Sequence, residues 1–427
     1  MIEAAPHRLS ESDFSRLTAG GGDPQTIRLL KRAARSRTLL AMRFVAAETA
    51  RLGHPDADLV GRACRVLSEA HEQAAAAVKR VLDEPEVATW AIGAARELVH
   101  GGTRFPPAAA ATVAAAAAVR SRMPADLTTT GGRSTELPSL GTVMPGGREI
   151  RIRPNGDECV IRADGRPVRL PAQPDVPAPG WSPLVPVRLG QKTVTLDRWT
   201  LGSLPQPFQD DLLRIGGSEA EAWSEVLSDG IELLRTHGTA GPVIEAVSTI
   251  TPLRQAGPHP ESATLADAFG CVLLSRPYDA RSAALTLVHE VQHAKLTVLL
   301  DLLPLLKTTA SERFYAPWRP DPRPLLGLLH GAYAHVGVIG FWKRQRDLEP
   351  DPRKAHEAEV EFARWSRATT EALSLLATRP ELTEHGHEVV TRMLKTLDVW
   401  SREPVSTSAR AEAERLRLAH RNEWGSR

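Results

Sequence analysis

The stretch from Asp279 to Leu303 constrains this 427-residue chain more than any other. It is apolar at almost every position, so it predicts a helix that is buried on all sides instead of lying on the surface. Pro304 marks its expected end. Within it, the segment LVHEVQHAKL places His289, Glu290 and His293 in a His-Glu-x-x-His pattern.

The two histidines of this pattern predict a metal site. On a helix, His289 and His293 lie one turn apart on the same face, with Cβ atoms ~6 Å apart, so two neutral imidazoles can hold one ion. The alternative is a pair of core histidines satisfied by hydrogen bonds, and the pattern also arises by chance. Two histidines and a glutamate in a buried apolar helix are costly unless they are paired or bound to metal, which favours the metal interpretation.

A third ligand is needed to complete such a site. The metzincin extension is excluded, because its glycine and third histidine fall at Leu296 and Leu299. A thermolysin-like site takes a glutamate from a following helix. The acidic segment HEAEVEFARW offers Glu357, Glu359 and Glu361, but these begin more than sixty residues further on.

The nearer candidate helix covers residues 325–347 and carries His330 and His335. These two are five apart, so on a straight helix they point ~140° away from each other and one of them reaches the metal. We choose His335, because Gly331 and Ala332 lie one turn before it and small residues let two helices approach closely. His330 is expected in the pocket wall, and a plain buried histidine is its alternative.

At this point a family resemblance becomes visible. The segment Leu287–Arg346, with LVHEVQHAKL, LLPLL and RFYAPWRPDPRPLLGLLHGAYAHVGVIGFWKRQR, resembles the HExxH-motif peptide-modification proteins of actinobacteria. More loosely, the resemblance extends to GGGDPQTIRLLKRAARSRTLL near the N-terminus. Members of that family sit beside short precursor peptides of ribosomally made natural products. Characterised relatives are iron(II)- and 2-oxoglutarate-dependent hydroxylases that act at the β-carbon of a precursor residue.

The resemblance implies a ligand set, two cofactors and a partner. It makes His289, His293 and His335 the metal ligands, with Fe(II) and 2-oxoglutarate as cofactors and a short ribosomal precursor peptide as substrate. The chain departs from the family at His330, where much of the family is expected to have glutamine.

The segment YAPWRPDPRP supplies residues for the cosubstrate. The far carboxylate of 2-oxoglutarate favours a bidentate arginine, and Arg319 and Arg323 are the candidates. In an extended polyproline conformation four residues cover ~12 Å, so both guanidinium groups reach one carboxylate only if the chain turns. We expect one to hold 2-oxoglutarate and the other the peptide or a structural carboxylate, with solvated loop arginines as the alternative. Tyr315 and Trp318 are pocket candidates, or else they cover the core.

Glu290 separates the possible functions. In a zinc metallopeptidase, the alternative to the hydroxylase, it is the general base that activates the metal-bound water. In an iron oxygenase it only orients a ligand or a water. A third possibility is a metal-bearing binding protein without catalysis.

Charge and cysteine content limit the partners and the location. With 53 basic and 51 acidic residues the net charge is +2, which gives no reason to expect nucleic acid or a membrane as partner. Three scattered cysteines fit a reducing cytoplasm. The first residues are polar and lack the basic segment followed by an apolar segment that a secretory signal has. The alanine-rich run 107–119 is too short to span a bilayer. We therefore expect a cytoplasmic protein.

The composition and the hydrophobic periodicity of the chain predict an α+β fold that is mainly α. Residues 1–126 read as an N-terminal helical region, 127–215 as an antiparallel β unit with a proline-rich linker, and 216–427 as the helical HExxH catalytic domain with a few strands. Asn155-Gly156 predicts a tight hairpin, and VPVRLGQKTVTL a second one. The segments VIEAVSTI and FGCVLLS are strand candidates in the last part.

Overall fold

The computed structural model describes residues 7–196, 204, 208, 210–213, 215–255, 257, 261–307 and 312–425. The expected fold class is confirmed: helices at the N-terminal end, antiparallel sheets in the centre, and C-terminal helices with a few strands. The chain forms two compact units. One consists of Lys31–Glu225 with Val247–Arg276, and the other of Pro6–Leu30 with Val226–Ala246 and Pro277–Arg427. The boundaries predicted from sequence stay a prediction.

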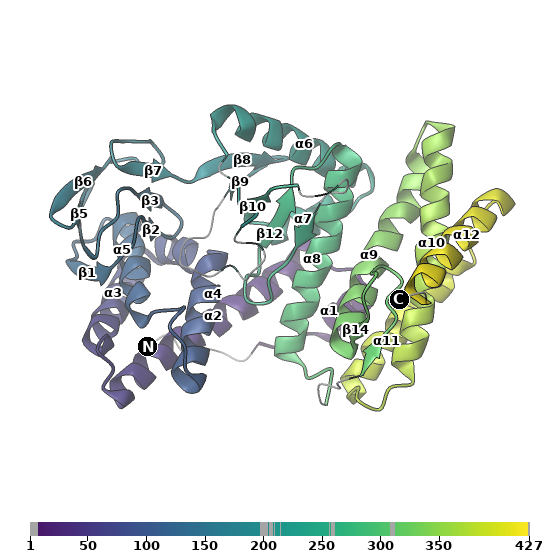
Figure 1. Ribbon diagram of the computed structural model, residues 1–427, viewed down its shortest axis with the longest axis horizontal. Helices are drawn as coiled ribbons and strands as arrows, with labels where there is room; N and C mark the ends of the chain where they lie inside the picture. Colours follow the sequence, from purple (N-terminus) through teal and green to yellow (C-terminus); the bar gives the residue numbers. More distant parts are fainter. Residues whose placement is uncertain are drawn as a thin grey trace. The chain divides into compact units, whose positions relative to one another are not determined.

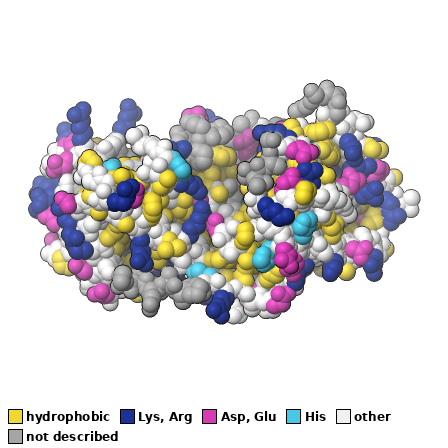
Figure 2. Space-filling model, turned by 90° about the horizontal axis from the view of Figure 1, so that it is seen from below, with side chains coloured by type: hydrophobic (Ala, Val, Ile, Leu, Met, Phe, Trp, Pro, Cys, Tyr) yellow, Lys and Arg dark blue, Asp and Glu magenta, His cyan; other side chains and the backbone are white. Residues whose placement is uncertain are grey.

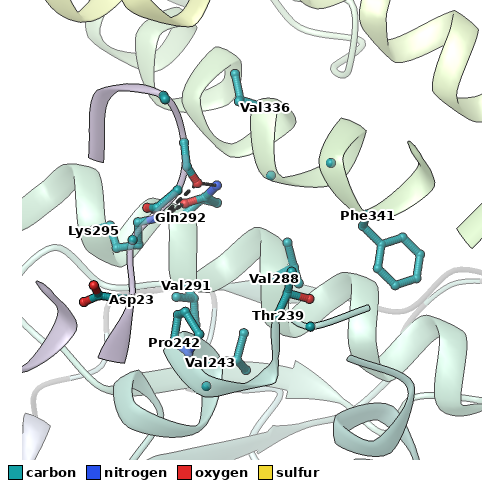
Figure 3. Close-up of a pocket in the computed structure, with 18 of the residues that line it drawn as sticks. Asp23, Thr239, Pro242, Val243, Val288, Val291, Gln292, Lys295, Val336 and Phe341 are labelled. Atoms are coloured by element: carbon teal, nitrogen blue, oxygen red, sulfur yellow. Dashed lines mark hydrogen bonds between the residues drawn. The ribbon is translucent and has the colours of Figure 1, made fainter. Parts of the chain in front are cut away.

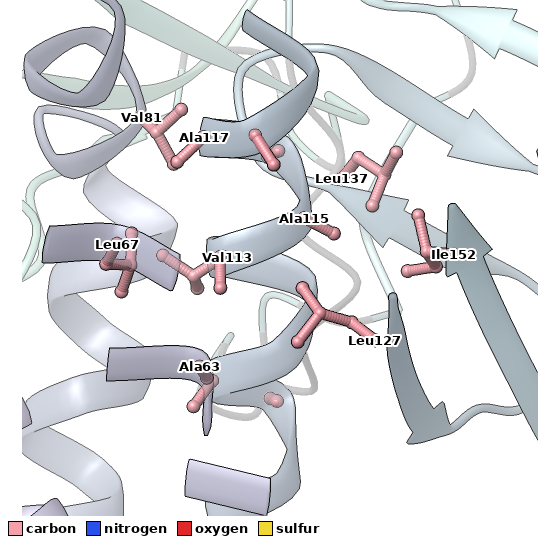
Figure 4. Close-up of a cluster of buried hydrophobic side chains, with 14 of the residues drawn as sticks. Ala63, Leu67, Val81, Val113, Ala115, Ala117, Leu127, Leu137 and Ile152 are labelled. Carbon is pink, nitrogen blue, oxygen red and sulfur yellow. The ribbon is translucent and has the colours of Figure 1, made fainter. Parts of the chain in front are cut away.

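In the first unit, an alanine helix lies between a helix and a sheet. The helices here are α2 (Pro24–Leu52), α3 (Ala57–Leu82), α4 (Pro85–His100), the short 3-10 helix η1 (Pro107–Ala109) and α5 (Ala110–Ser121). Ala114 to Ala118 are fully buried. Figure 4 shows Leu67 and Val81 of α3 on one side of α5, and Leu127, Leu137 and Ile152 of the strands on the other. Small side chains let α5 approach both neighbours closely, which gives the alanine run a packing role.

Two antiparallel sheets follow in the same unit. The first has the order β1-β4-β5-β6, with β1 (Leu127–Thr130), β4 (Glu149–Asn155), β5 (Glu158–Ala163) and β6 (Arg166–Leu170). The predicted hairpin is confirmed: β4 and β5 pair up to Asn155↔Glu158, and Gly156 has φ +63°, which suits glycine in a tight turn. The second has the order β2-β3-β7, with β2 (Thr135–Leu137), β3 (Gly141–Val143) and β7 (Trp181–Pro183).

A five-stranded mixed sheet completes the first unit, in the order β11-β12-β10-β9-β8. The second predicted hairpin is its antiparallel pair β8 (Val185–Leu189) and β9 (Lys192–Leu196). Strand β10 (Thr249–Leu253) runs parallel to both β9 and β12 (Cys271–Ser275), and β11 (Ser262–Ala263) is antiparallel to β12. FGCVLLS is therefore a strand as expected. VIEAVSTI is only half right, because its first residues end helix α7 (Ala240–Ala246) and the strand begins at Thr249.

The second unit is built around α8 (Ala280–Leu302) and α9 (Leu325–Leu348), which pack side by side (Figure 1). A short antiparallel pair, β13 (Arg313–Phe314) and β14 (Arg323–Pro324), precedes α9. The other helices of this unit are α1 (Glu11–Thr18), α7, α10 (Pro352–Ala377), α11 (Glu384–Ser401) and α12 (Thr407–Gly425). Helix α6 (Gly217–Thr236) belongs to it from Val226 on. The N-terminal segment joins this unit through contacts of α1 with α11 and a 2.6 Å hydrogen bond from the Tyr333 hydroxyl to the Leu17 carbonyl.

Helix α9 is long and apolar enough to be a candidate membrane span by composition, with a mean hydropathy of 1.4 over its most apolar window. Of that window, 78% is buried inside the protein, as expected for the core helix of a folded unit.

Basic and acidic side chains are interspersed on the face shown in Figure 2. This distribution matches the near-zero net charge of the chain.

Candidate metal centre

Helix α8 presents its two motif histidines together. The helix starts with a capping box, in which the Asp279 carboxylate accepts from Ser282 N at 2.8 Å and the Ser282 hydroxyl accepts from Asp279 N at 3.1 Å. The Nε2 atoms of His289 and His293 are 3.1 Å apart. Two nitrogens ~2.1 Å from one ion, at an angle of ~90–110°, are themselves ~3.0–3.4 Å apart. The pair therefore fits one ion, and in the metal-free chain one ring can donate a hydrogen bond to the other.

Helix α9 brings two further histidines to this pair. The ring of His335 is 5.6 Å from that of His289, and the ring of His330 is 5.8 Å from that of His293, between centroids. His335 Nδ1 donates to the Gly331 carbonyl at 2.8 Å, and since a carbonyl only accepts, this bond fixes the tautomer. Nε2 of His335 is left with a lone pair. His330 lies beside His293, and its role in the pocket stays a prediction.

The complete ligand set is not preassembled. Among the described residues, no group of three or more His, Cys, Asp or Glu side chains is placed to hold a metal ion together. The residues present therefore fit a metal through His289 and His293. His335 has the right tautomer and neighbourhood, and its role as third ligand stays a prediction.

Burial keeps all four imidazoles neutral. Burial lowers the pKa of His289, and burial together with the neighbouring histidines and Arg323 holds the pKa of His293 well below its usual range. Burial lowers the pKa of His330 to about 4, and burial together with the neighbouring His289 lowers that of His335 to about 3. At neutral pH the rings are in the form that binds metal ions.

Glu290 is buried on α8 beside His289, with 2% of its surface exposed. Its negative charge partly opposes the lowering of the His289 pKa, so the carboxylate is close enough to act on that imidazole. Such a position serves both as a general base near a metal and as a group that orients a ligand.

Two tryptophans contact His335. Trp318 stacks on its ring with centroids 4.4 Å apart and an interplanar angle of 20°. A Cβ at Gly331 would lie 2.2 Å from Trp318 Nε1, so the missing side chain of this glycine makes room for the indole. We had expected Gly331 to let two helices approach, and this reason is wrong. Trp365 of α10, 4.8 Å from His335, donates its Nε1 to Glu361 at 2.6 Å and was not identified from the sequence.

The arginine segment turns back on itself. Residues 315–322 connect β13 to β14, where Phe314 pairs with Arg323. Arg319 Nε and Arg323 Nη1 both donate to the Asp321 carboxylate, each at 3.0 Å. The segment therefore turns so that both guanidinium groups reach one carboxylate, and that carboxylate is the side chain of Asp321. The charge of Arg323 contributes to the lowered pKa of His293.

Tyr315 belongs to a different cluster. Its hydroxyl is 2.9 Å from His420 Nδ1, and its ring centroid is 5.1 Å from that of Trp424, both on α12. Burial raises its pKa. These contacts match the alternative expectation, in which Tyr315 covers the core.

The glutamates of α10, considered for a thermolysin-like site, have other partners. Glu357 pairs with Arg281 at 3.2 Å, and Glu359 accepts from the Ser406 hydroxyl at 2.6 Å. Glu361 accepts from Trp365, as described above. The described structure thus gives each of these carboxylates a partner other than the four imidazoles.

Comparisons with known proteins add no assignment to this geometry. No protein-family model matches the chain, and no curated protein matches its sequence.

Proposed function

We propose that the chain is an iron(II)- and 2-oxoglutarate-dependent hydroxylase that acts at the β-carbon of a residue in a short ribosomal precursor peptide. Metal binding is supported by the pair of neutral imidazoles of His289 and His293, whose Nε2 atoms are 3.1 Å apart. The sequence resemblance of Leu287–Arg346 carries the choice of iron, cosubstrate and peptide. The three cysteines are free of disulfides, which agrees with a cytoplasmic site of action.

In this proposal each residue near the candidate metal centre has its own role. Bound iron with O2 supplies the oxidation of a C–H bond, while 2-oxoglutarate is converted to succinate and CO2. His289 and His293 offer lone pairs, and His335 joins them through Nε2, held by its bond to the Gly331 carbonyl. Trp318 covers one face of His335 and keeps water away from it. Of the two arginines, Arg323 is the better candidate for the far carboxylate of 2-oxoglutarate, because its charge contributes to the lowered pKa of His293.

A zinc metallopeptidase acting on a peptide or its leader is the second candidate, and the observation that favours it is the buried carboxylate of Glu290 next to His289. The two functions differ in what Glu290 does. A peptidase needs it to take a proton from the attacking water, and loss of such a base typically costs ~10²–10⁴ in rate. A hydroxylase does not need a proton transfer at this atom.

The decisive experiment is mass spectrometry of the precursor after incubation with Fe(II), ascorbate and 2-oxoglutarate. We expect a gain of one oxygen that requires O2 and 2-oxoglutarate. Glu290→Gln, which keeps size and hydrogen-bonding reach, should retain iron and measurable hydroxylation. Cleavage that proceeds anaerobically without 2-oxoglutarate, and that disappears in Glu290→Gln, would establish the peptidase.

A further inference from the structure

A cavity of about 420 Å³ lies within the second unit, and its lining contains none of the four histidines. Its walls come from the loop Ala19–Pro24, the segment Gly238–Val243 and helices α8 and α9 (Figure 3). Trp400 of α11 also lines it. Val291 and Lys295 on α8 are each two residues from a motif histidine, so they point ~200° around the helix from it. The volume falls in the range of small-ligand sites, ~300–1,000 Å³.

Most of the wall is apolar. The side chains that form this part are branched aliphatic or aromatic, and come from four elements: Val243, Val288, Val291, Val336, Phe341 and Trp400. A surface of this kind favours the hydrocarbon body of a ligand, because burial of apolar area is favourable and does not require a particular direction.

A buried lysine lies in this wall without an anionic partner. Lys295 is 4% exposed, and its ammonium donates to the carbonyls of Gly20 at 3.1 Å and Gly21 at 2.6 Å and to the Gln292 side chain. Figure 3 shows Lys295 and Gln292 meeting the glycine loop at one edge of the cavity. All three acceptors are neutral, and among the described residues no carboxylate pairs with this lysine. Lysines are rarely buried in this way unless a negative charge compensates them.

A cationic side chain lines the cavity from α9. Arg344 Nη1 donates to the Gly340 carbonyl at 2.8 Å, and the described structure gives its guanidinium no ion pair. Asp23 also lines the cavity, where its carboxylate accepts from Thr26 N at 2.8 Å and lies 3.7 Å from Arg16, whose shorter ion pair, 2.8 Å, is with Asp13. Arg344 is therefore a charged donor of this wall with no anionic partner among the described residues.

We propose that this cavity is a binding site for an organic monocarboxylate with an aliphatic or aryl body. The apolar wall takes the body, and the carboxylate accepts from the guanidinium donors that Arg344 does not use within the chain. The guanidinium of Arg344, which has no ion pair among the described residues, favours an acid over its neutral analogue, and a partly enclosed site strengthens that preference. The site goes beyond the proposed function, since it uses other residues on the opposite side of α8.

The test is isothermal titration of the full chain with hexanoate and with its neutral match, hexanamide. We expect hexanoate to bind one to one and hexanamide to bind at least ~10-fold more weakly, the usual effect of a hydrogen bond to a charged group. Arg344→Gln should weaken hexanoate at least ~10-fold and leave hexanamide unchanged. Val288→Phe, which fills the cavity, should remove both. Arg353→Gln, an exposed arginine at the start of α10, is the matched control and should change neither.

Circular dichroism establishes that each variant is folded before titration. Equal affinities for the acid and the amide would overturn the proposal, as would full hexanoate binding in Arg344→Gln. Absence of binding by hexanoate and phenylacetate at millimolar concentrations would overturn it as well.

Discussion

Replacing Gly331 with alanine tests the geometry around His335 directly. The added Cβ would lie 2.2 Å from Nε1, 2.3 Å from Cε2 and 2.4 Å from Cζ2 of Trp318. Carbon atoms in contact prefer ~3.5–4.0 Å, so the indole must retreat by more than ~1 Å. Trp318 stacks on His335 with centroids 4.4 Å apart, so this movement disturbs the candidate third ligand.

The expected cost follows from two opposing effects. Overpacking of a well-packed site costs ~1–3 kcal/mol. Alanine in place of glycine inside a helix gains up to ~1 kcal/mol. Gly340→Ala in the same helix is the control, because its Cβ would meet Trp400 at 3.3 Å and the end of the flexible Arg344 side chain at 3.4 Å. We expect Gly331→Ala to be ~1–3 kcal/mol less stable than Gly340→Ala.

The assay is denaturant unfolding of both metal-free variants at neutral pH, followed by circular dichroism, with metal content measured separately after reconstitution. Gly331→Ala should also retain less metal than Gly340→Ala, because the indole no longer holds the His335 ring. If Gly331→Ala is as stable as the control and keeps its metal, the stacking of Trp318 on His335 does not describe the protein.

The remaining predictions concern the ligands, the cosubstrate and pH. His335→Ala should lose metal as fully as a change at either motif histidine, whereas His330→Ala should keep most of it; elemental analysis showing the reverse would exchange their roles. Arg323→Leu should raise the apparent KM for 2-oxoglutarate with iron content unchanged, since losing such a contact costs roughly 2–5 kcal/mol. Arg319→Leu should stay near wild type, and normal 2-oxoglutarate dependence in both variants would move the cosubstrate site elsewhere. The pKa values of His330 and His335, about 4 and about 3, lie below the ~6.5 of an unfolded histidine. The metal-free protein should therefore keep full stability above that value and lose up to ~1.4 kcal/mol per histidine for each pH unit below it; an unfolding midpoint that does not change with pH would contradict their burial.

Local signals in the sequence predicted the elements that hold the candidate site. Asp279 and Pro304 bracket helix α8 to within one or two residues, because capping and proline chemistry act on immediate neighbours. The hairpin at Asn155-Gly156 follows from the same kind of rule. VIEAVSTI misled us because Val243 and Ile244 favour strands, whereas packing in the second unit keeps them in α7.

Long-range contacts left no such signal. Trp365 reaches His335 from α10, and the pairing of β10 with β9 and β12 joins segments far apart in the chain. The grouping of the N-terminal segment with the C-terminal helices depends on hydrogen bonds such as that from Tyr333 to the Leu17 carbonyl. Periodicity and spacing describe a residue's own element, and they do not say which element it meets.

The polar residues of α8 explain why the motif alone does not decide its chemistry. In the sequence, His289, Glu290 and His293 appear as polar groups in an apolar helix, and the cost of burying them favours a metal. The structure adds two further polar residues of the same helix. Gln292 and Lys295 donate to the carbonyls of the glycine loop instead of joining the imidazoles. The ring nitrogens of the histidines face each other at 3.1 Å, with two more imidazoles nearby. The metal hypothesis therefore depends on this local arrangement of neutral rings, and polar residues elsewhere on the helix, such as Gln292 and Lys295, do not add to it.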